Sequence, residues 1–162
     1  MGGMESGGVA IRSLAVGDVV AVASLLVAQL EEHAIPCRAE HVEAALREIL
    51  AHEEAGFALV ADRGRLAVGV AYVSFARPLE HAGQVAWLEE LYVAPSHRAC
   101  GLGTSLLREA ASRADARGCV SMELEVNRGH ERAARLYERE GFRDLERRHF
   151  AKPLRAWDWG GG

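Results

Sequence analysis

Residues 88–104 read LEELYVAPSHRACGLGT, and this stretch says most about the fold. An apolar segment with two adjacent glutamates ends at Pro95, and a loop containing Gly101 and Gly103 then leads into an amphipathic helix. The first turn of a helix leaves backbone amides unpaired, and glycine lets a ligand approach them closely. These amides and the helix dipole form an anion site that suits a pyrophosphate. The alternative is a plain glycine-rich connection, since Leu106 breaks the G-x-G-x-x-G pattern and no P-loop lysine follows.

Periodicity and turn signals around this stretch predict a mixed α/β domain. Asp18 is a candidate N-cap, Pro36 ends the first helical segment, and Arg63-Gly64 is a hairpin turn signal. The expected elements are strand 9–13, helix 19–32, helix 40–51, strands 57–62, 66–76 and 84–94, a helix that follows the glycine loop and ends at residue 118, strand 119–127, helix 130–140, and strands 142–148 and 149–154. Strands alternate with helices only in the second half, which favours a mixed sheet over a doubly wound parallel one.

Bulk properties exclude several classes of protein. The 162 residues suit one domain, which we expect at 9–155 between a flexible leader at 1–8 and a flexible tail at 156–162. A net charge of −4 leaves no basic excess to neutralise phosphates, which argues against a nucleic-acid binder. No apolar run is long enough to span a bilayer. The three cysteines are far apart and match no metal-ligand spacing, so we expect a cytoplasmic protein with free thiols and no metal.

A longer pattern adds to the glycine loop. The acidic strand that ends in V-A-P, the R-x-x-G-x-G loop at 98–103 and the T-S-L helix start at 104–106 resemble the signature of the GCN5-related N-acetyltransferase (GNAT) superfamily. Downstream, H-E-R-A-A-R-L-Y at 130–137, followed by G-F at 141–142, is similar to the family's N-x-x-A-x-x-[LF]-Y…G-F segment. The resemblance covers residues 56–152. It implies the family's α/β fold, a central mixed sheet of six to seven strands flanked by about four helices.

The resemblance also implies acetyl-CoA as co-substrate. Backbone groups of Leu91, Tyr92 and Val93 would pair with the pantetheine arm, like an added strand. The pyrophosphate would be wrapped by the loop residues Arg98, Ala99, Cys100, Gly101, Leu102, Gly103 and Thr104.

Two positions depart from the family pattern. Cys100 stands where a basic residue is common, so cofactor affinity is expected to depend more on Arg98 and the backbone amides. His130 stands where an asparagine usually begins the helix, and Asn127 precedes it by three residues. Either Asn127 or His130 then makes the hydrogen bond to the cofactor, and the sequence leaves this open.

Transfer of an acetyl group to an amine sets two chemical demands. An alkylamine with a pKa of about 10.4 is mostly protonated at neutral pH, so a carboxylate must take its proton, and the departing thiolate must receive one. Glu89 and Glu90 are adjacent on a strand and are expected to point to opposite faces, so that only one faces the cleft. The resemblance favours Glu89 as the base, with Glu90 as the alternative, and Tyr137 as the proton donor. The simpler interpretations are a solvated pair of carboxylates and a core tyrosine.

These patterns together lead to an expected function. We expect an N-acetyltransferase that moves acetyl from acetyl-CoA to a primary amine, of a small molecule or a peptide, by direct attack in a ternary complex. The alternative is a catalytically silent acyl-CoA-binding sensor or interaction module of the same fold. Glu31, Glu32 and Glu80 in the expected acceptor region favour a cationic small molecule. The sequence leaves open the acceptor's identity and whether the chain forms a homodimer.

Overall fold

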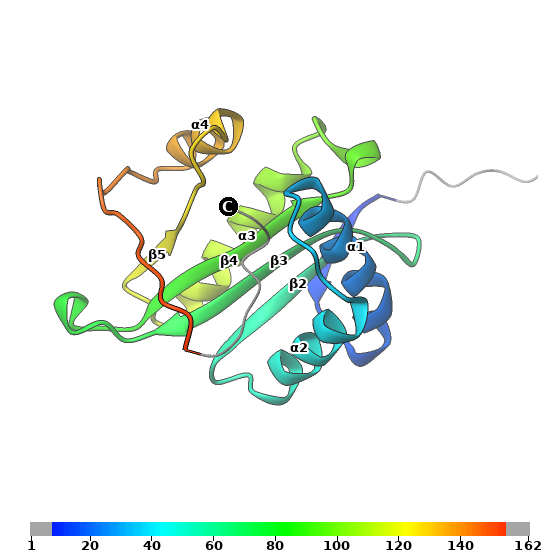
Figure 1. Cartoon of the computed structure of the whole chain (residues 1–162), viewed down its shortest axis with the longest axis horizontal. Coiled ribbons are helices and arrows are strands. Elements are labelled where there is room, and N and C mark those ends of the chain that lie inside the picture. Colours follow the sequence, from blue (N-terminus) through cyan, green and yellow to red (C-terminus); the bar gives the residue numbers. More distant parts are fainter. Residues whose placement is uncertain (1–7, 155–162) are drawn as a thin grey trace, which may run out of the picture.

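The computed structural model describes residues 8–154 and has a central sheet with helices on both faces (Figure 1). Its strands are β1 (Ala10–Ser13), β2 (Gly56–Arg63), β3 (Leu66–Ala76), β4 (Val85–Val93) and β5 (Ser121–Leu124). Its helices are α1 (Val19–Glu32), α2 (Ala39–Ala51), α3 (Leu102–Ala116) and α4 (Glu131–Arg139). Short 3₁₀ turns are η1 (Val16–Asp18), η2 (Leu79–His81) and η3 (Pro95–His97). The leader predicted at 1–8, apart from Gly8, and the tail predicted at 156–162 lie outside the described residues.

The sheet is mixed, as predicted. Its order is β1-β2-β3-β4-β5; the pairs from β1 to β4 are antiparallel, and β4 and β5 are parallel. Parallel neighbours need a crossover, and α3 supplies it. The predicted hairpin joins β2 and β3, but its turn residues are Gly64 and Arg65, one position after the predicted Arg63-Gly64, with φ values of +59° and +72°. Positive φ at both positions is what a two-residue turn of this kind requires.

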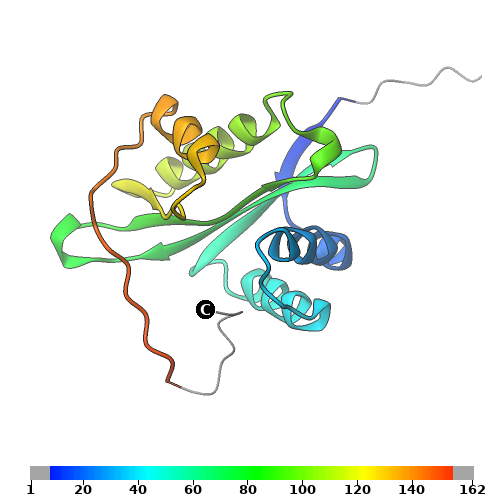
Figure 2. The same cartoon turned by 45° about the horizontal axis from the view of Figure 1, so that its top comes forward.

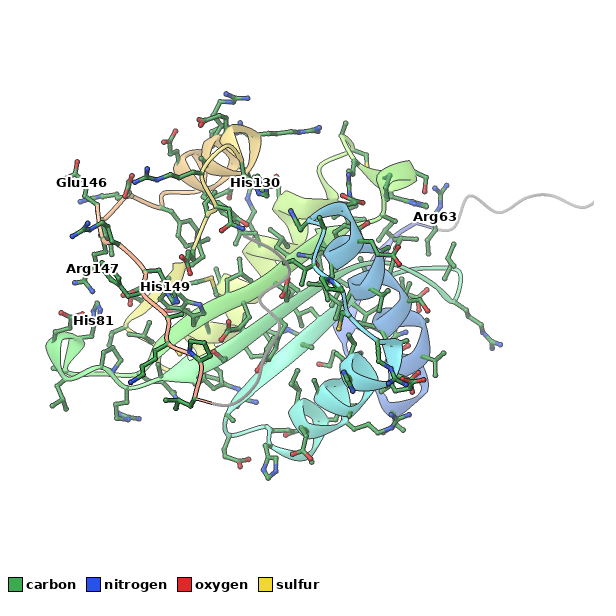
Figure 3. The ribbon with its side chains drawn as sticks, viewed as in Figure 1. Arg63, His81, His130, Glu146, Arg147 and His149 are labelled. Atoms are coloured by element: carbon green, nitrogen blue, oxygen red, sulfur yellow. The ribbon has the colours of Figure 1, made fainter. Side chains whose placement is uncertain are left out.

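The last two predicted strands, 142–148 and 149–154, are wrong. No strand follows α4 in the described residues, so the sheet has five strands rather than six or seven. The exposed apolar side chains of this segment are Leu145 (55%), Phe150 (79%) and Leu154 (88%). A segment that buries so little apolar surface gains too little to offset the entropy of ordering it as a strand. Arg147 of this segment, which Figure 3 labels, instead forms an ion pair with Glu80 of η2 at 2.8 Å.

Different helices cover the two faces of the sheet. α1 and α2 lie on one face, and α3 and α4 lie on the other (Figure 2). Alternate residues of a strand serve the two layers: Val60 of β2 packs in the α1–α2 cluster and Leu59 in the α3 cluster. Because both faces are covered, β2 and β3 have nearly continuous apolar sequences.

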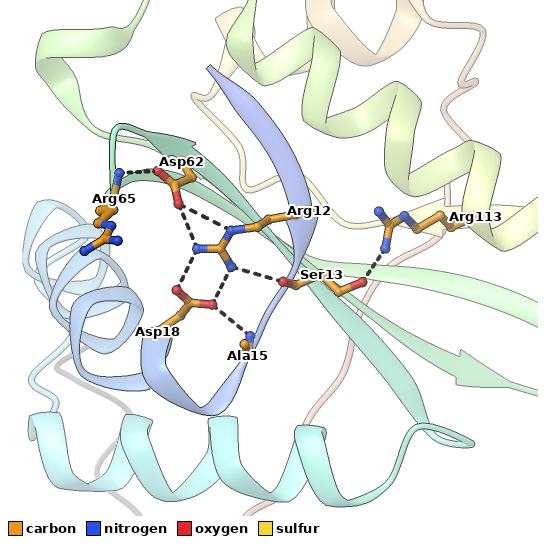
Figure 4. A network of polar contacts seen from close by, with 7 residues as sticks. All are labelled: Arg12, Ser13, Ala15, Asp18, Asp62, Arg65 and Arg113. Carbon is orange, nitrogen blue, oxygen red and sulfur yellow. Dashed lines mark hydrogen bonds and ion pairs between the residues drawn. The ribbon is translucent and has the colours of Figure 1, made fainter. Parts of the chain in front are cut away.

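A polar network fastens β1 to the elements beside it (Figure 4). Arg12 of β1 donates to both oxygens of Asp18, at 2.6 and 2.8 Å, and to Asp62 of β2 at 2.8 Å. Arg12 thereby holds the pKa of Asp18 below its usual value. Asp18 occupies the predicted N-cap position of α1, but its carboxylate accepts from Arg12 and the amide of Ala15 rather than from the helix amides. Asp18 therefore fastens the start of α1 to Arg12 of β1 instead of capping the helix, and Arg12 adds the contact to β2.

Candidate active site

β4 and β5 run side by side for only part of their length. Their pairing extends from Val85 with Ser121 to Leu88 with Leu124. Beyond this point, residues 90–93 of β4 pair only with β3 within the described part of the chain. From Leu124 the chain leads away to α4 (Figure 1). The free edge of β4 is therefore open to an extended ligand with amide groups, as an added strand would be bound.

A β-bulge lies where the two strands part. Adjacent residues of β3 pair with Leu88 and Glu90, which leaves Glu89 without a partner across the strand. Such a bulge interrupts the alternation of side chains. Leu88 and Leu91 both pack against the α3 side although they are three residues apart. The alternation of β4 side chains between the two faces of the sheet therefore shifts by one residue at Glu89.

Both glutamates lie on the face covered by α1 and α2. Gln29 of α1 donates from Nε2 to Glu90 Oε2 at 2.7 Å. Ser74 Oγ donates to Glu89 Oε1 at 2.6 Å. Ser74 lies two residues from Tyr72, which packs in the α1–α2 cluster, so both point to that face. The prediction that Glu89 and Glu90 point to opposite faces is wrong, because the bulge breaks the alternation on which it rested.

Glu90 is the more buried of the two carboxylates, and Glu89 is exposed. Burial raises the pKa of Glu90, the hydrogen bond from Gln29 opposes the increase, and the negative charge of Glu89 adds to it. A carboxylate with a raised pKa is a better proton acceptor than an ordinary glutamate.

Tyr137 of α4 belongs to the same electrostatic environment. Its ring is half-buried and meets Phe142 edge to face, with centroids 5.7 Å apart. Burial raises the pKa of Tyr137, and the charge on Glu90 raises it further. The hydroxyl group therefore stays protonated at neutral pH. Glu90, a candidate proton acceptor, therefore acts electrostatically on Tyr137, a candidate proton donor in the opposite layer.

The loop before α3 presents a run of free backbone amides. Within the described residues, none of the amides of residues 99–104 has a hydrogen-bond acceptor, and the amide of Ser105 is the first to bond, to Gly101 O at 3.0 Å. Gly101 has a φ of +82°, a left-handed conformation that glycine adopts without strain. A side chain at Gly103 would meet only Val93, at 3.9 Å, so the space in front of these amides is open. This geometry has the features that the predicted anion site requires.

Arg98 is engaged with neighbouring elements rather than free. Its Nε donates to Val93 O at 2.8 Å, and a terminal nitrogen donates to both oxygens of Glu32, at 2.9 and 3.0 Å. Its guanidinium lies over the ring of Tyr92, 5.2 Å from the centroid, and the Tyr92 hydroxyl donates to Glu32 at 2.6 Å. Tyr92 and then Arg98 lower the pKa of Glu32. Arg98 therefore ties α1 to β4, and Glu32 adds little free negative charge to the acceptor face.

Three other predicted cofactor contacts, Cys100, Asn127 and His130, are exposed. Cys100 donates its thiol to His97 O at 2.9 Å. The carbonyl oxygen of Asn127 accepts the amide of His130 at 3.2 Å. The ring of His130, which Figure 3 labels, stacks on that of His33 at the end of α1, with centroids 5.0 Å apart. This stack joins α1 to α4, and the choice between Asn127 and His130 as the cofactor contact stays a prediction.

Sequence reasoning missed three polar side chains beside the carboxylates. Gln29 follows Val22 and Leu26 on the buried side of α1, so a polar residue on an apolar stripe was the available signal. Tyr72 and Ser74 alternate on β3, and nothing in the sequence shows that a bulge in β4 turns the carboxylates toward them.

The structure also bears on thiols, metals and membranes. Cys37, Cys100 and Cys119 are all free, as predicted. Between residues 8 and 154, no three His, Cys, Asp or Glu side chains come together as a metal site would need. In the same residues, no helix has the length and apolar character to cross a bilayer.

Known proteins share this architecture. The family model described as the Acetyltransferase (GNAT) family matches residues 22–142. The chain belongs to the GNAT family. This membership confirms the resemblance inferred from the strand, loop and helix motifs, and the GNAT fold itself.

Individual relatives of this GNAT chain differ in how much they match. The thialysine N-epsilon-acetyltransferase of Mus musculus is 35% identical over 63 residues, which are 39% of this chain and 37% of the mouse enzyme. An integron cassette protein from a salt-marsh metagenome superimposes with a TM-score of 0.81 at 20% identity, covering 90% of this chain and 91% of its own. An aminoglycoside N-acetyltransferase in complex with CoA superimposes with a TM-score of 0.79 at 19% identity. The match covers 93% of this chain and 98% of that enzyme. At these identities the structural likeness shows the fold alone.

Proposed function

We propose that this GNAT member transfers the acetyl group of acetyl-CoA to a primary amine by direct attack within a ternary complex. The observation that carries the proposal is the combination of three features: the free edge of β4 beyond β5, the free amides of residues 99–104, and the pair Glu90 and Tyr137. The first two suit the two ends of coenzyme A, and the third suits proton transfer. The CoA complex of an aminoglycoside N-acetyltransferase with the same fold supports the choice of cofactor.

Backbone groups are the main cofactor ligands in this proposal. The amides of residues 99–104 bind the diphosphate, and hydrogen bonds to an ionised acceptor are roughly twice as strong as neutral ones. The dipole of α3 adds up to about 2 kcal/mol. Cys100 brings no charge and Arg98 shares its charge with Glu32, which leaves most of the binding to the amides. Residues 91–93 pair with the amide groups of the pantetheine arm.

Glu90 is the general base, in place of the expected Glu89. Deprotonating an alkylamine of pKa about 10.4 at neutral pH costs about 4–5 kcal/mol. Glu90, with its raised pKa, takes this proton directly or through a water. Glu89 is exposed and held by Ser74, and its role is to attract the ammonium group.

Tyr137 is the general acid. Its hydroxyl stays protonated at neutral pH and donates to the sulfur of the departing thiolate. Backbone N–H groups on the open edge of β4 polarise the thioester carbonyl, since preorganised donors of this kind stabilise a developing oxyanion. The chain thus supplies a base, an acid and an oxyanion site without a covalent acyl-enzyme.

The acceptor in this proposal is a small alkylammonium compound. Glu89 and Glu90 place two carboxylates on the face covered by α1 and α2, which favours a cation. Glu32 and Glu80, two of the acids noted in the sequence, are paired with arginines and contribute little to this attraction. The partial relative that is named for thialysine supports an aliphatic amine.

Tyr137→Phe tests the mechanism. We expect thiol release from acetyl-CoA with alkylamines such as thialysine, and a loss of about 10²-fold or more in kcat when the hydroxyl is removed. CoA affinity measured by calorimetry should stay at the wild-type value, because the amides of residues 99–104 are untouched. Tight CoA binding without thiol release for any amine would instead support the silent binding module.

A further inference from the structure

Gln29 has a hydrogen-bonding need that the protein itself does not meet. It lies on the buried side of α1, in line with the core residues Val22 and Leu26. Its Nε2 donates to Glu90 at 2.7 Å. Its Oε1 is buried and has no hydrogen-bond partner among residues 8–154. A buried acceptor oxygen without a partner is unfavourable, so an external donor at this position gains binding energy.

The carboxylate of Glu90 determines how this amide is oriented. An ionised carboxylate only accepts hydrogen bonds, so Gln29 must present its N–H to Glu90 and leave its oxygen free. The free oxygen and the carboxylate therefore belong to one cluster of acceptors. A ligand with several N–H donors on a single atom, such as an alkylammonium ion, satisfies both.

We propose that Gln29 binds the acceptor amine through Oε1 while its Nε2 holds Glu90 in position to take the proton. This inference rests on the proposed function. One N–H bond of the ammonium breaks as its proton moves to the Glu90 carboxylate, and the electron pair stays on nitrogen for attack on the thioester carbon. A second N–H stays hydrogen-bonded to Gln29. Gln29 is thus a substrate-binding residue and a positioning residue for the base.

The groups around Glu90 determine in which direction a change at Gln29 moves the pH dependence of kcat/KM. Gln29 from α1 and Glu89 from β4 act on this carboxylate, and its charge in turn raises the pKa of Tyr137 from α4. The hydrogen bond from Gln29 lowers the pKa of Glu90, whereas burial and Glu89 raise it. Removing the amide therefore raises the pKa and moves the acid limb of kcat/KM to higher pH.

Two variants at Gln29 separate its roles, and Gln84, the chain's other glutamine, gives the control. Gln29→Met loses both contacts, and we expect the amine KM to rise about 10- to 100-fold, with the acid limb at higher pH. Gln29→Glu keeps an oxygen for the ammonium but adds a charge beside Glu90. At pH values above the acid limb, the KM of Gln29→Glu for the amine should stay near the wild-type value. Its acid limb should lie at higher pH than that of Gln29→Met. Gln84→Met should leave both quantities unchanged.

CoA affinity, measured by calorimetry, checks that each variant is folded. Wild-type amine KM and an unmoved acid limb in a CoA-binding Gln29→Met protein would overturn the inference and leave the proposed function intact. Should Gln29→Met fail to fold, an unmoved limb in Gln29→Glu would overturn it equally. A wild-type protein that acetylates no amine would overturn the proposed function, and this inference with it.

Discussion

Glu89 and Glu90 are neighbours in the sequence, yet their surroundings give them different chemistry. Glu89 is exposed and accepts a hydrogen bond from Ser74. Glu90 is packed under α1 and accepts from Gln29. A carboxylate removed from water is harder to ionise, which raises the pKa of Glu90. The same two residues on a regular strand would have faced opposite layers.

Exchanging each glutamate for glutamine separates their roles. Glu90→Gln removes the proposed base, and we expect kcat/KM for the amine to fall about 10²- to 10⁴-fold. Glu89→Gln removes a surface charge, and we expect a change of about tenfold or less. Steady-state kinetics with a fixed amine and saturating acetyl-CoA measure both.

The pH profile of the same variants provides a second readout. The base must be ionised to act, so wild-type kcat/KM falls as the pH drops through the raised pKa of Glu90. That limb should lie above the value of about 4.3 for an ordinary glutamate, persist in Glu89→Gln and vanish in Glu90→Gln. A limb that survives in Glu90→Gln and vanishes in Glu89→Gln would assign the base to Glu89.

Helix α3 has a left-handed glycine at each end. Gly118 follows the helix with a φ of +81°, and its amide bonds to Asp115 O at 2.8 Å. This arrangement satisfies the last carbonyl groups and ends the helix. Gly101 has nearly the same φ, +82°, but the amides that follow it stay free. The same backbone conformation thus closes the helix at one end and opens a ligand site at the other.

These two glycines give a matched pair of variants. An added Cβ meets nothing within 4 Å at either position, so Gly101→Ala and Gly118→Ala carry the same left-handed strain of about 1–2 kcal/mol. Gly101→Ala also moves the amides of residues 99–104. We expect similar losses of unfolding free energy in the two variants, and a weaker CoA complex, by about tenfold, only in Gly101→Ala. Equal CoA affinities by calorimetry would show that the loop amides do not bind the diphosphate.

The candidate site draws on both layers of the molecule. Gln29 comes from the layer of α1, whereas Tyr137 comes from α4 on the opposite face (Figure 2). Glu90 links them, because it accepts a hydrogen bond from Gln29 and its charge raises the pKa of Tyr137. The position of α1 relative to the sheet therefore matters for the chemistry, and Arg12 fixes the start of this helix through Asp18 (Figure 4).

Asp18→Asn tests this fastening through stability. Losing a charge-assisted pair should lower the free energy of unfolding by about 1–3 kcal/mol at neutral pH. Each kcal/mol lost should lower Tm by roughly 2–4 °C. The pKa of Asp18 is lowered by folding, so its stabilising contribution is present above the unfolded value of about 3.9 and is lost as the pH falls through the folded value. The difference from wild type should therefore shrink in acid.

Glu43→Gln is the control for this variant. Glu43 pairs with Arg47 one helical turn away at 3.1 Å, and such surface pairs contribute about 0.5 kcal/mol or less. Thermal melts of both variants across the acid range compare them. A loss in Asp18→Asn no larger than in Glu43→Gln, or one that does not depend on pH, would contradict the role given to this network.

The sequence alone determined the strand, loop and helix around residues 88–104, the mixed order of elements and membership in the GNAT family. The elements and their order depend on local physics, namely the φ freedom of glycine, the free amides of a helix start and the period of apolar residues, whereas the family was inferred from the resemblance of its motifs. The number of strands was overestimated, because family resemblance cannot show that residues 142–154 bury too little apolar surface to pair.

Only the tertiary structure decided which glutamate is buried and what surrounds it. Gln29 is 61 residues from Glu90, and Tyr137 lies on a helix of the opposite layer. A bulge shifts the phase of a strand by one residue, and that shift follows from the pairing with β3 rather than from the residues of β4 themselves. Burial and charge act through space, so the pKa of a side chain is a property of the folded chain and not of the segment that carries it.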